Sequence, residues 1–572
     1  MKTNVLHYGD NLDILRKREY FPDESIDLIY LDPPFNSQAT YNVLFREVTG
    51  VGSQAQIEAF EDTWHWGPAA AQAYEEVVTG PYEGVARLLR AMVEGLRHSD
   101  VTAYLCMMAV RLVELHRVLK PTGLIYLHCD PTAGPYVRVL MDSVFGPTNF
   151  RSEVVWRRSN AHSKLTRQFG PIHDTILFFS KTDGARFHPG LRTHYRRYMA
   201  EQFTNADEKG PYRLNEITGS GTRSGESGQP WRGIDIGARG RHWAIPAGLT
   251  SELGLQGLRQ HDKLDALAAQ GDIVFSSSGF PRYRQRPTAG VPYQDIWAYQ
   301  PYTEGLLEGT GEGVDRDVKW LENEEERLGY PTQKPLGLLE RIIESSCDPD
   351  DLVLDPFCGC GTAVHASHKL GRRWIGIDIT YLAINLIERR MRDAFSGVQF
   401  EVIGDPKDLS SARDLAGRSK MQFQFWAVSR VHPDGQPVGS KRGGPDRGID
   451  GLIPIVVGGK AEKPVYRRAI VSVKGGEHVS VAMVRDLVGV LEREKEPIGV
   501  LLTLEPPTQP MVTEAATAGF YHNDLWQKDY PRVQILTVEE MLAGKRPDIP
   551  PTRSPFAQAP TEREERRTKR ML

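Results

Sequence analysis

A short acidic loop with two prolines, Asp32-Pro33-Pro34-Phe35, follows the apolar run Ile26–Leu31. An exocyclic amino group on adenine or cytosine is a poor nucleophile, because its lone pair is delocalised into the ring. The Asp32 carboxylate and the Pro33 carbonyl could each accept one N–H and draw that nitrogen toward tetrahedral geometry. The prolines fix φ and stiffen the loop, and Phe35 offers a flat face to a base flipped out of a duplex. A plain proline turn after a buried strand is the alternative interpretation.

A second loop, Asp355 to Thr362, follows Leu352–Leu354 more than three hundred positions later. Gly359 and Gly361 allow a close approach of backbone to ligand, and the run from Ala363 to Leu370 predicts a helix. Asp378 ends the strand pattern that starts at Trp374, where a ribose diol could be held. The spacing is not Gly-x-Gly-x-x-Gly, which disfavours a dehydrogenase. We interpret the loop as a nucleoside-cofactor site.

The surrounding pattern predicts the elements that position both loops. Apolar, β-rich runs recur at 26–31, 124–127, 175–180, 352–354 and 374–379, and helical patterns separate several of them. Strands alternating with helices predict a mostly parallel sheet covered on both faces. Ligands bind such sheets outside the carboxyl ends of the strands. We therefore expect the two loops to form one pocket.

The chain of 572 residues is long enough for several domains. We expect a Rossmann-like domain in two parts, 1–182 and 325–410, with a helical insertion at about 55–103. The Gly-, Arg- and aromatic-rich region 183–324 between them predicts a loop-rich domain. A further α/β block spans 420–548, with strands at 469–473, 498–504 and 533–536. A charged, Pro-rich tail, 549–572, predicts disorder.

Composition excludes some classes of protein. Hydrophobic residues make up 40% and charged residues 25% of the chain, as in globular proteins. No apolar run suits a membrane span or a signal peptide, and five cysteines form no disulfide framework, so we expect a cytoplasmic protein. Net charge is −4, yet residues 151–200 hold ten Lys/Arg against three acids. This basic stretch is either a footprint of phosphate contacts or a solvated face.

In these residues the chain resembles the β class of DNA amino-methyltransferases, over about 1–182 and 325–405. The order of segments matches: catalytic loop, target-recognition region, then cofactor loop. The resemblance implies S-adenosylmethionine as cofactor and assigns Asp32, Pro33, Pro34 and Phe35 to catalysis. It assigns these residues to the cofactor: Asp10, in Gly9-Asp10-Asn11-Leu12; Thr332 and Lys334, in Pro331-Thr332-Gln333-Lys334-Pro335; and Asp355, Phe357, Gly359, Gly361 and Asp378.

The resemblance also implies a substrate and partners. Asp and Phe in the catalytic loop favour N6 of adenine, with N4 of cytosine as the alternative. The substrate is then double-stranded DNA, which associates the protein with the nucleoid. A homodimer and partner proteins of a restriction-modification or phage-defence system are expected possibilities. Region 183–324 becomes the target-recognition domain, with these candidate DNA contacts: Arg223, Trp231, Arg232, Arg239, Arg241, Tyr283 and Arg284.

The block 420–548 resembles the Mrr-type restriction-endonuclease fold. That fold pairs an Asp with a Glu- or Gln-x-Lys on the next strand, and the acids hold Mg²⁺. Asp450 and Lys474 match the pattern, but Ser472 stands where the Glu or Gln belongs. One hypothesis is a fusion that both methylates and cuts DNA, with Mg²⁺ at Asp450. The favoured one is a module without cleavage activity. A DNA-binding scaffold with neither activity is the remaining alternative.

Overall fold

The computed structural model describes residues 1–34, 40–46, 52–61, 66–160, 169–299, 307–308, 313–321, 326–328, 330, 332–438, 448–460, 463–552 and 561–562. The chain divides into two compact units. The first comprises 1–188, 295–298 and 317–568, and the second comprises 189–294, 299–316 and 569–572. Within the described part of the chain, no helix is long and apolar enough to cross a membrane.

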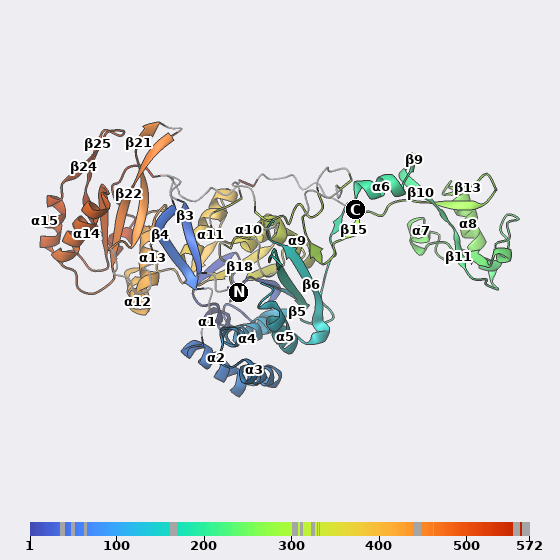
Figure 1. Cartoon of the computed structure of the whole chain (residues 1–572), viewed down its shortest axis with the longest axis horizontal. Coiled ribbons are helices and arrows are strands. Elements are labelled where there is room, and N and C mark those ends of the chain that lie inside the picture. The colour runs from blue at the N-terminus through green and yellow to red at the C-terminus, as the bar shows by residue number, and fades with distance from the viewer. Residues whose placement is uncertain are drawn as a thin grey trace. The chain divides into compact units, whose positions relative to one another are not determined.

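The first unit is built on a nine-stranded sheet in the order β16-β6-β7-β5-β2-β17-β18-β1-β19. Figure 1 labels its strands β5, β6 and β18. Its strands, in chain order, are β1 (Val5–Tyr8), β2 (Ile26–Leu31), β5 (Leu119–Cys129), β6 (Phe150–Arg157), β7 (His173–Ser180), β16 (Ile296–Trp297), β17 (Leu352–Asp355), β18 (Arg373–Asp378) and β19 (Glu401–Ile403). All neighbours pair in parallel except β7, which is antiparallel to both β5 and β6. The predicted mostly parallel sheet is confirmed.

Helices cover both faces of the sheet, as the alternation along β2 requires. Ile29 and Leu31 pack in the cluster formed with α1 (Asn11–Leu15), α4 (Asp100–Val118) and α5 (Gly134–Phe145). Leu28 and Tyr30 point to the other face, into the cluster with α9 (Leu336–Ser346) and α10 (Thr362–Lys369). Because successive side chains of a strand point to opposite faces, β2 is buried on both sides.

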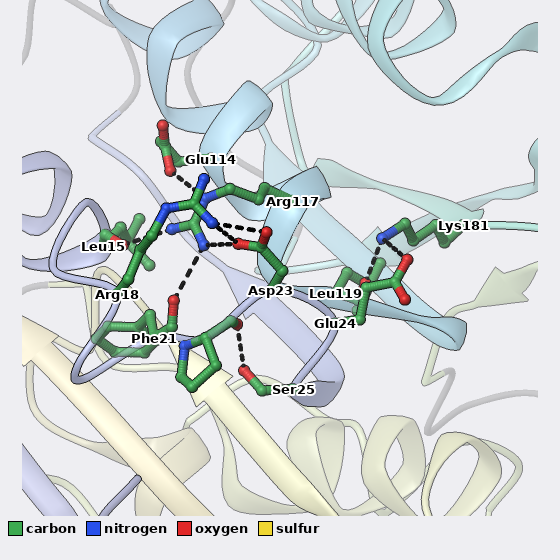
Figure 2. A network of polar contacts seen from close by, with 11 residues as sticks. Leu15, Arg18, Phe21, Asp23, Glu24, Ser25, Glu114, Arg117, Leu119 and Lys181 are labelled. Atoms are coloured by element: carbon green, nitrogen blue, oxygen red, sulfur yellow. Dashed lines mark hydrogen bonds and ion pairs between the residues drawn. The ribbon is translucent and has the colours of Figure 1, made fainter.

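A polar network fixes the loop that leads into β2 (Figure 2). Arg117, in the last turn of α4, donates hydrogen bonds to the carbonyls of Leu15 and Phe21 and to the Asp23 carboxylate. Nearby, Lys181 donates to the Leu119 carbonyl. Charge-assisted bonds of this kind are stronger than neutral ones. They anchor the amino end of β2, and the strand then carries Asp32 at its opposite end.

The second unit has its own small core. A four-stranded sheet joins β13 (Ile273–Phe275), β14 (Pro281–Gln285), β10 (Gly210–Glu216) and β9 (Asn205–Asp207). Trp231 and Tyr283, predicted to contact DNA, are 3% and 8% exposed and belong to this core with Trp243 and Leu264. That prediction is wrong for both, because a side chain buried in the core cannot reach a DNA groove.

The unit boundaries are narrower than the predicted 183–324. Segment 183–188 stays with the first unit, where the amide of His188 donates to the Ser345 carbonyl. Segment 295–298 contributes β16 to the edge of the large sheet, and Asp317 pairs with Arg341 of α9. The chain therefore returns to the large sheet at β16, before residue 325, where the second part of the Rossmann-like domain was predicted to begin.

The C-terminal block forms a five-stranded sheet in the order β20-β21-β22-β23-β26, within the first unit. These strands are β20 (Gln436–Pro437), β21 (Gly451–Lys460), β22 (Lys463–Lys474), β23 (Ile498–Thr503) and β26 (Val533–Thr537), and α14 (Val481–Glu494) links two of them. The three predicted strands are confirmed. Helix α13 (Lys420–Val431) packs on α11 (Tyr381–Ala394), where Tyr381 and Leu382 join the cluster that contains Trp426.

Two predictions of local structure are wrong in part. The insertion at 55–103 begins not as helix but as strand β4 (Gly52–Glu61), because its backbone pairs with β3 (Thr40–Arg46); helices α2 (Pro68–Thr79) and α3 (Glu83–Leu96) follow. In the tail predicted to be disordered, the Pro551 carbonyl accepts from the Val456 amide, and Glu562 pairs with His365 at 2.9 Å. These contacts hold 549–552 and 561–562; the other tail residues lie outside the described ones.

Candidate active site

One cavity of about 280 Å³ lies at the carboxyl ends of the central strands. Both loops line it, so the prediction of a shared pocket is confirmed. Ten of the predicted site residues line this cavity: Asp10, Asp32, Pro33, Pro34, Thr332, Lys334, Asp355, Phe357, Gly359 and Asp378. Phe35 lies outside the described residues, and Gly361 is not among the lining residues.

Sheet order explains why segments so far apart in sequence meet. Strand β17 pairs in parallel with β2 on one side and with β18 on the other. Leu31, Asp355 and Asp378 end these three strands, so the loops that follow leave the sheet at the same edge. Neighbouring strands are spaced by about 5 Å. Three acidic side chains, counting Asp32, are therefore concentrated in a small space.

Lys334, which was predicted to contact the cofactor, forms an ion pair with Asp32, the predicted catalytic residue. Its Nζ lies 2.5 Å from Asp32 Oδ2, and both side chains are largely buried. Thr362 Oγ1 donates to the Lys334 carbonyl at 3.3 Å, which ties this segment to the start of α10. The ammonium thus occupies the position from which an amino donor would approach Asp32. The sequence predicted that Lys334 lies in the site, but not that it pairs with Asp32.

The carboxylates of the cofactor side carry raised pKa values. Burial raises the pKa of Asp378 to about 6, although its carboxylate accepts from the Gly359 amide at 2.9 Å and from Thr380. Burial also raises the pKa of Asp355 well above its usual range, and the charges of Asp32 and Asp378 add to the effect. A cavity crowded with acids attracts a cationic ligand. The acidic side chains of the cavity therefore fit a sulfonium-bearing cofactor such as S-adenosylmethionine.

The two glycines of the second loop have different tasks. Gly359, at φ +48, faces the cavity, and a Cβ there would lie 3.3 Å from the Tyr330 ring. Gly361, at φ +76, caps α10, and a Cβ there would lie 2.7 Å from Ile387. Gly361 does not line the cavity, and its contact with the cofactor stays a prediction. Its lack of a side chain is needed by the turn and by the packing of α11.

One buried cation of the cavity, next to Asp10, was not predicted from the sequence. Arg111 is 4% exposed, lines the cavity and pairs with Asp10 at 3.0 Å. It also donates to Asn11 Oδ1, while Asn11 Nδ2 donates to the Pro356 carbonyl at 2.8 Å. This chain of bonds joins the first loop of the protein to the cofactor loop. Its sequence signal is a single charged residue within the otherwise apolar run 104–113 of this helix.

The arginines predicted to contact DNA divide into two groups. Carboxylates of the same unit hold three of them: Asp265 binds Arg232, Glu216 binds Arg241, and Asp207 binds Arg284. Arg223 is exposed, and the Arg239 guanidinium lies 5.0 Å from the centre of the Phe280 ring. A guanidinium paired with a carboxylate must break that pair to bind phosphate. Arg223 and Arg239 are therefore the stronger candidates.

Two of the three nuclease-like residues, Asp450 and Ser472, are in contact, but they do not form a metal site. Asp450 precedes β21, and Ser472 and Lys474 lie on the paired strand β22. Asp450 Oδ2 accepts from the Val473 amide at 2.6 Å and from Ser472 Oγ at 3.3 Å, and Oδ1 accepts from Gln424 at 2.9 Å. No group of three metal-binding side chains gathers anywhere in the described residues. The residues present do not fit Mg²⁺, because the carboxylate is already occupied by donors.

Comparison with known proteins gives a family match. The model of a DNA methylase family, N6_N4_Mtase, matches residues 26–389. The type II methyltransferase M.EcaI of Enterobacter cloacae is 29% identical over 292 residues, 50% of this chain and 57% of the relative. The StyLTI Mod subunit, from a type III restriction-modification enzyme of Salmonella typhimurium, is 25% identical over 366 residues, 64% of this chain and 49% of the relative. The chain thus spans about half the length of these two relatives.

A shorter match and a solved structure complete the comparison. The DNA adenine methyltransferase YhdJ of Escherichia coli is 36% identical over 135 residues, 24% of this chain and 42% of the relative. The structure of the PvuII DNA methyltransferase (cytosine-N4-specific) aligns over 70% of this chain and 89% of its own, with 14% identity and a TM-score of 0.31.

Proposed function

Because the chain belongs to the N6/N4 DNA methylase family, we propose that it is a site-specific DNA methyltransferase that uses S-adenosylmethionine. One observation carries the proposal. Asp32 and Gly359, separated by more than three hundred positions, line the same cavity. A single pocket can then hold an extruded base at one lip and a nucleoside cofactor at the other.

The residues divide the work by position. Asp32 and the Pro33 carbonyl accept the two protons of the target amino group and orient its lone pair, and Pro34 stiffens the loop. Asp378 holds a ribose, Asp355 and Phe357 border the methionine end, and Gly359 lets the backbone approach it. Asp10, Thr332 and Lys334 complete the cofactor side, with Arg111 holding Asp10. When bound, the cofactor supplies an electrophilic methyl group on its sulfonium.

Adenine N6 is the proposed target atom, and cytosine N4 is the alternative. Asp rather than Ser before the two prolines supports adenine. The test incubates the protein and methyl-labelled cofactor with genomic DNA from a methylation-free strain and identifies the modified nucleoside by mass spectrometry. N6-methyladenine is expected. N4-methylcytosine would overturn the choice of base, and absence of both would overturn the proposed activity.

The substrate is double-stranded DNA, read by the second unit with Arg223 and Arg239 as its first candidates. A restriction-modification or phage-defence setting belongs to the proposal, and the name of the StyLTI Mod subunit supports restriction-modification. We also propose that the protein lies with the DNA in the cytoplasm and that it forms a homodimer. Alanine at Arg239 should weaken DNA binding and make the affinity less dependent on salt, because one phosphate contact fewer releases fewer counterions. Unchanged binding to duplexes that carry the recognised site would remove Arg239 from the interface.

For residues 420–548 the proposal is a nuclease-like module without cleavage activity. The occupied Asp450 carboxylate supports it, and so does the uncharged Ser472. Incubation of unmethylated plasmid with the protein and Mg²⁺ tests it, with Lys474→Ala as control. No nicking is expected from either protein. Nicking by the natural protein that disappears in Lys474→Ala would restore the fusion hypothesis.

A further inference from the structure

A chain of buried polar groups leads from the cavity to the surface through three strands. The Tyr30 side chain, on β2, lines the cavity two residues before Asp32. Its hydroxyl lies 3.1 Å from His128 Nδ1, on β5. His128 Nε2 lies 3.2 Å from Asp174 Oδ2, on β7, and Arg158 pairs with the other oxygen of Asp174 at 3.2 Å. The proposed function gives these groups no task.

The chain lies almost completely out of water except at its far end. Tyr30, His128 and Asp174 are 2%, 0% and 3% exposed, whereas the Arg158 side chain is 37% exposed. Burying such polar groups is costly unless partners satisfy them, and Asp174 Oδ1 is met by the charge of Arg158 without a hydrogen bond. The network thus joins two compartments that are otherwise separated by apolar core. One compartment is the cavity, and the other is solvent at Arg158.

The partners fix the direction in which a proton can move. Burial acts to raise the pKa of Asp174, but the hydrogen bond from His128 and the charges of Lys334 and Arg158 outweigh it, so the pKa lies below its usual range. An ionised Asp174 draws the imidazole proton to Nε2. Nδ1 is then the lone-pair nitrogen and accepts from the Tyr30 hydroxyl. This order of donors is the one in which a histidine can take up a proton from a phenol.

We infer that Tyr30, His128 and Asp174 form a proton relay that serves the target amino group; the inference rests on the proposed methyltransferase function. In the transfer, the bond from nitrogen to the methyl carbon forms and the sulfur–carbon bond breaks, with its electron pair left on sulfur. The nitrogen then carries one proton too many. One of its two N–H bonds, the one whose proton the Pro33 carbonyl accepted before the transfer, breaks, and that proton passes to the Tyr30 oxygen as the Tyr30 hydroxyl proton passes to His128 Nδ1. Asp174 stabilises the resulting imidazolium, which later releases the proton toward solvent.

The neighbouring strand offers a matched control. Tyr126 on β5 is as buried as Tyr30 at 3% exposure, and its hydroxyl bonds with Ser346 at 2.8 Å, but it does not belong to the cavity lining. Phenylalanine at either position removes one buried hydroxyl from the same face of the sheet. A merely structural network predicts similar losses in both variants. A relay predicts a loss of methylation in Tyr30→Phe alone.

The first experiment measures single-turnover methylation by Tyr30→Phe and Tyr126→Phe, with cofactor affinity followed by calorimetry. We expect Tyr30→Phe to lose about 10²-fold in rate, as general acid–base groups do, with cofactor affinity retained. We expect Tyr126→Phe to keep the natural rate. Equal rates in the two variants would overturn the relay. If the natural protein itself methylates nothing, the proposed function fails first, and this comparison separates the two failures.

A second variant remains informative even when packing is disturbed. His128→Gly leaves a space the size of an imidazole ring, and imidazole or pyrazole can be added to refill it. Both rings have the same shape, but pyrazole is by far the weaker base. We expect imidazole to restore methylation in this variant and pyrazole not to restore it. Equal rescue by both rings, or rescue by neither, would assign His128 to packing alone.

Discussion

Lys334 Nζ lies 2.5 Å from the Asp32 carboxylate, although 302 positions separate the two residues in the chain. The pair joins the catalytic loop of the first half to the cofactor half, and both partners are largely buried. Removing one member of a buried pair leaves an uncompensated charge, so conservative replacements are the informative ones. A carboxylate held this way meets its substrate already oriented.

Asp32→Asn should abolish methylation while leaving cofactor binding nearly intact. The amide keeps the shape of the side chain but replaces one acceptor with a donor. Loss of a preorganised hydrogen bond at a reacting group lowers rates by about 10²- to 10³-fold. Methyl transfer to DNA from labelled cofactor gives the rate, and calorimetry gives the affinity. A variant that retains most of its activity would remove Asp32 from the mechanism.

Gly361→Ala should destabilise the fold, whereas Gly359→Ala should mainly weaken cofactor binding. At Gly361 the new Cβ would lie 2.7 Å from Ile387, in the core, and at Gly359 it would face the cavity. Overpacking of this kind costs about 1–3 kcal/mol. Chemical denaturation and calorimetry separate the two effects.

Gly397→Ala is the control for backbone strain alone, because that glycine has φ +74 and open space around its Cβ position. The Gly397→Ala variant should lose less stability than the Gly361→Ala variant. Equal losses of stability in both would mean that φ, rather than contact with Ile387, governs Gly361.

Cofactor affinity should fall as the pH falls below about 6. Burial raises the pKa of Asp378 to about 6, and the ionised carboxylate is the better acceptor for a ribose diol. One pH unit below that pKa, about one molecule in ten carries the charge, so binding at pH 5 should be about tenfold weaker than above pH 7. Calorimetry across pH 5 to 8 checks this. An affinity that is constant over this range would contradict the ribose assignment.

The same raised pKa gives the opposite trend for stability without cofactor. The unfolded chain releases this proton near pH 3.8, and the folded protein releases it only near pH 6. Folding is therefore favoured by this group at low pH, and the contribution is lost as the pH rises through about 6. Saturating cofactor should reduce the loss in denaturation experiments at pH 7.5, because binding favours the ionised form.

Asp450→Ala should destabilise the C-terminal block without affecting methylation. The change leaves the Val473 amide and Gln424 without the acceptor they now share, which costs about 1–3 kcal/mol. Asp486→Ala, at an exposed position on α14 of the same block, is the control. If both variants unfold alike, the carboxylate is not the structural centre that its contacts imply.

The sequence alone was sufficient for the central strands of the large sheet and for the chemistry of the loops that follow them. Apolar runs as strongly marked as 26–31 and 374–379 predict strands at nearly their observed bounds, because buried parallel strands need continuous hydrophobic segments. Asp32 and Asp378 were recognisable because acidic turns after such strands lie at the edge where ligands bind.

Burial and pairing were not readable from sequence, because they depend on partners distant along the chain. Trp231 and Tyr283 look like DNA contacts in an Arg-rich region, yet the second unit uses them as core. The Ser472 substitution cast doubt on a metal site, but only the bonds to Asp450 showed its carboxylate occupied. The pairing of Lys334 with Asp32 and the hydrogen bonds behind Tyr30 exist only because the sheet order places β2 between β17 and β5, and β5 beside β7. Tertiary structure decided those contacts, since hydrogen bonds and ion pairs act over a few ångströms of space, whatever the distance along the chain.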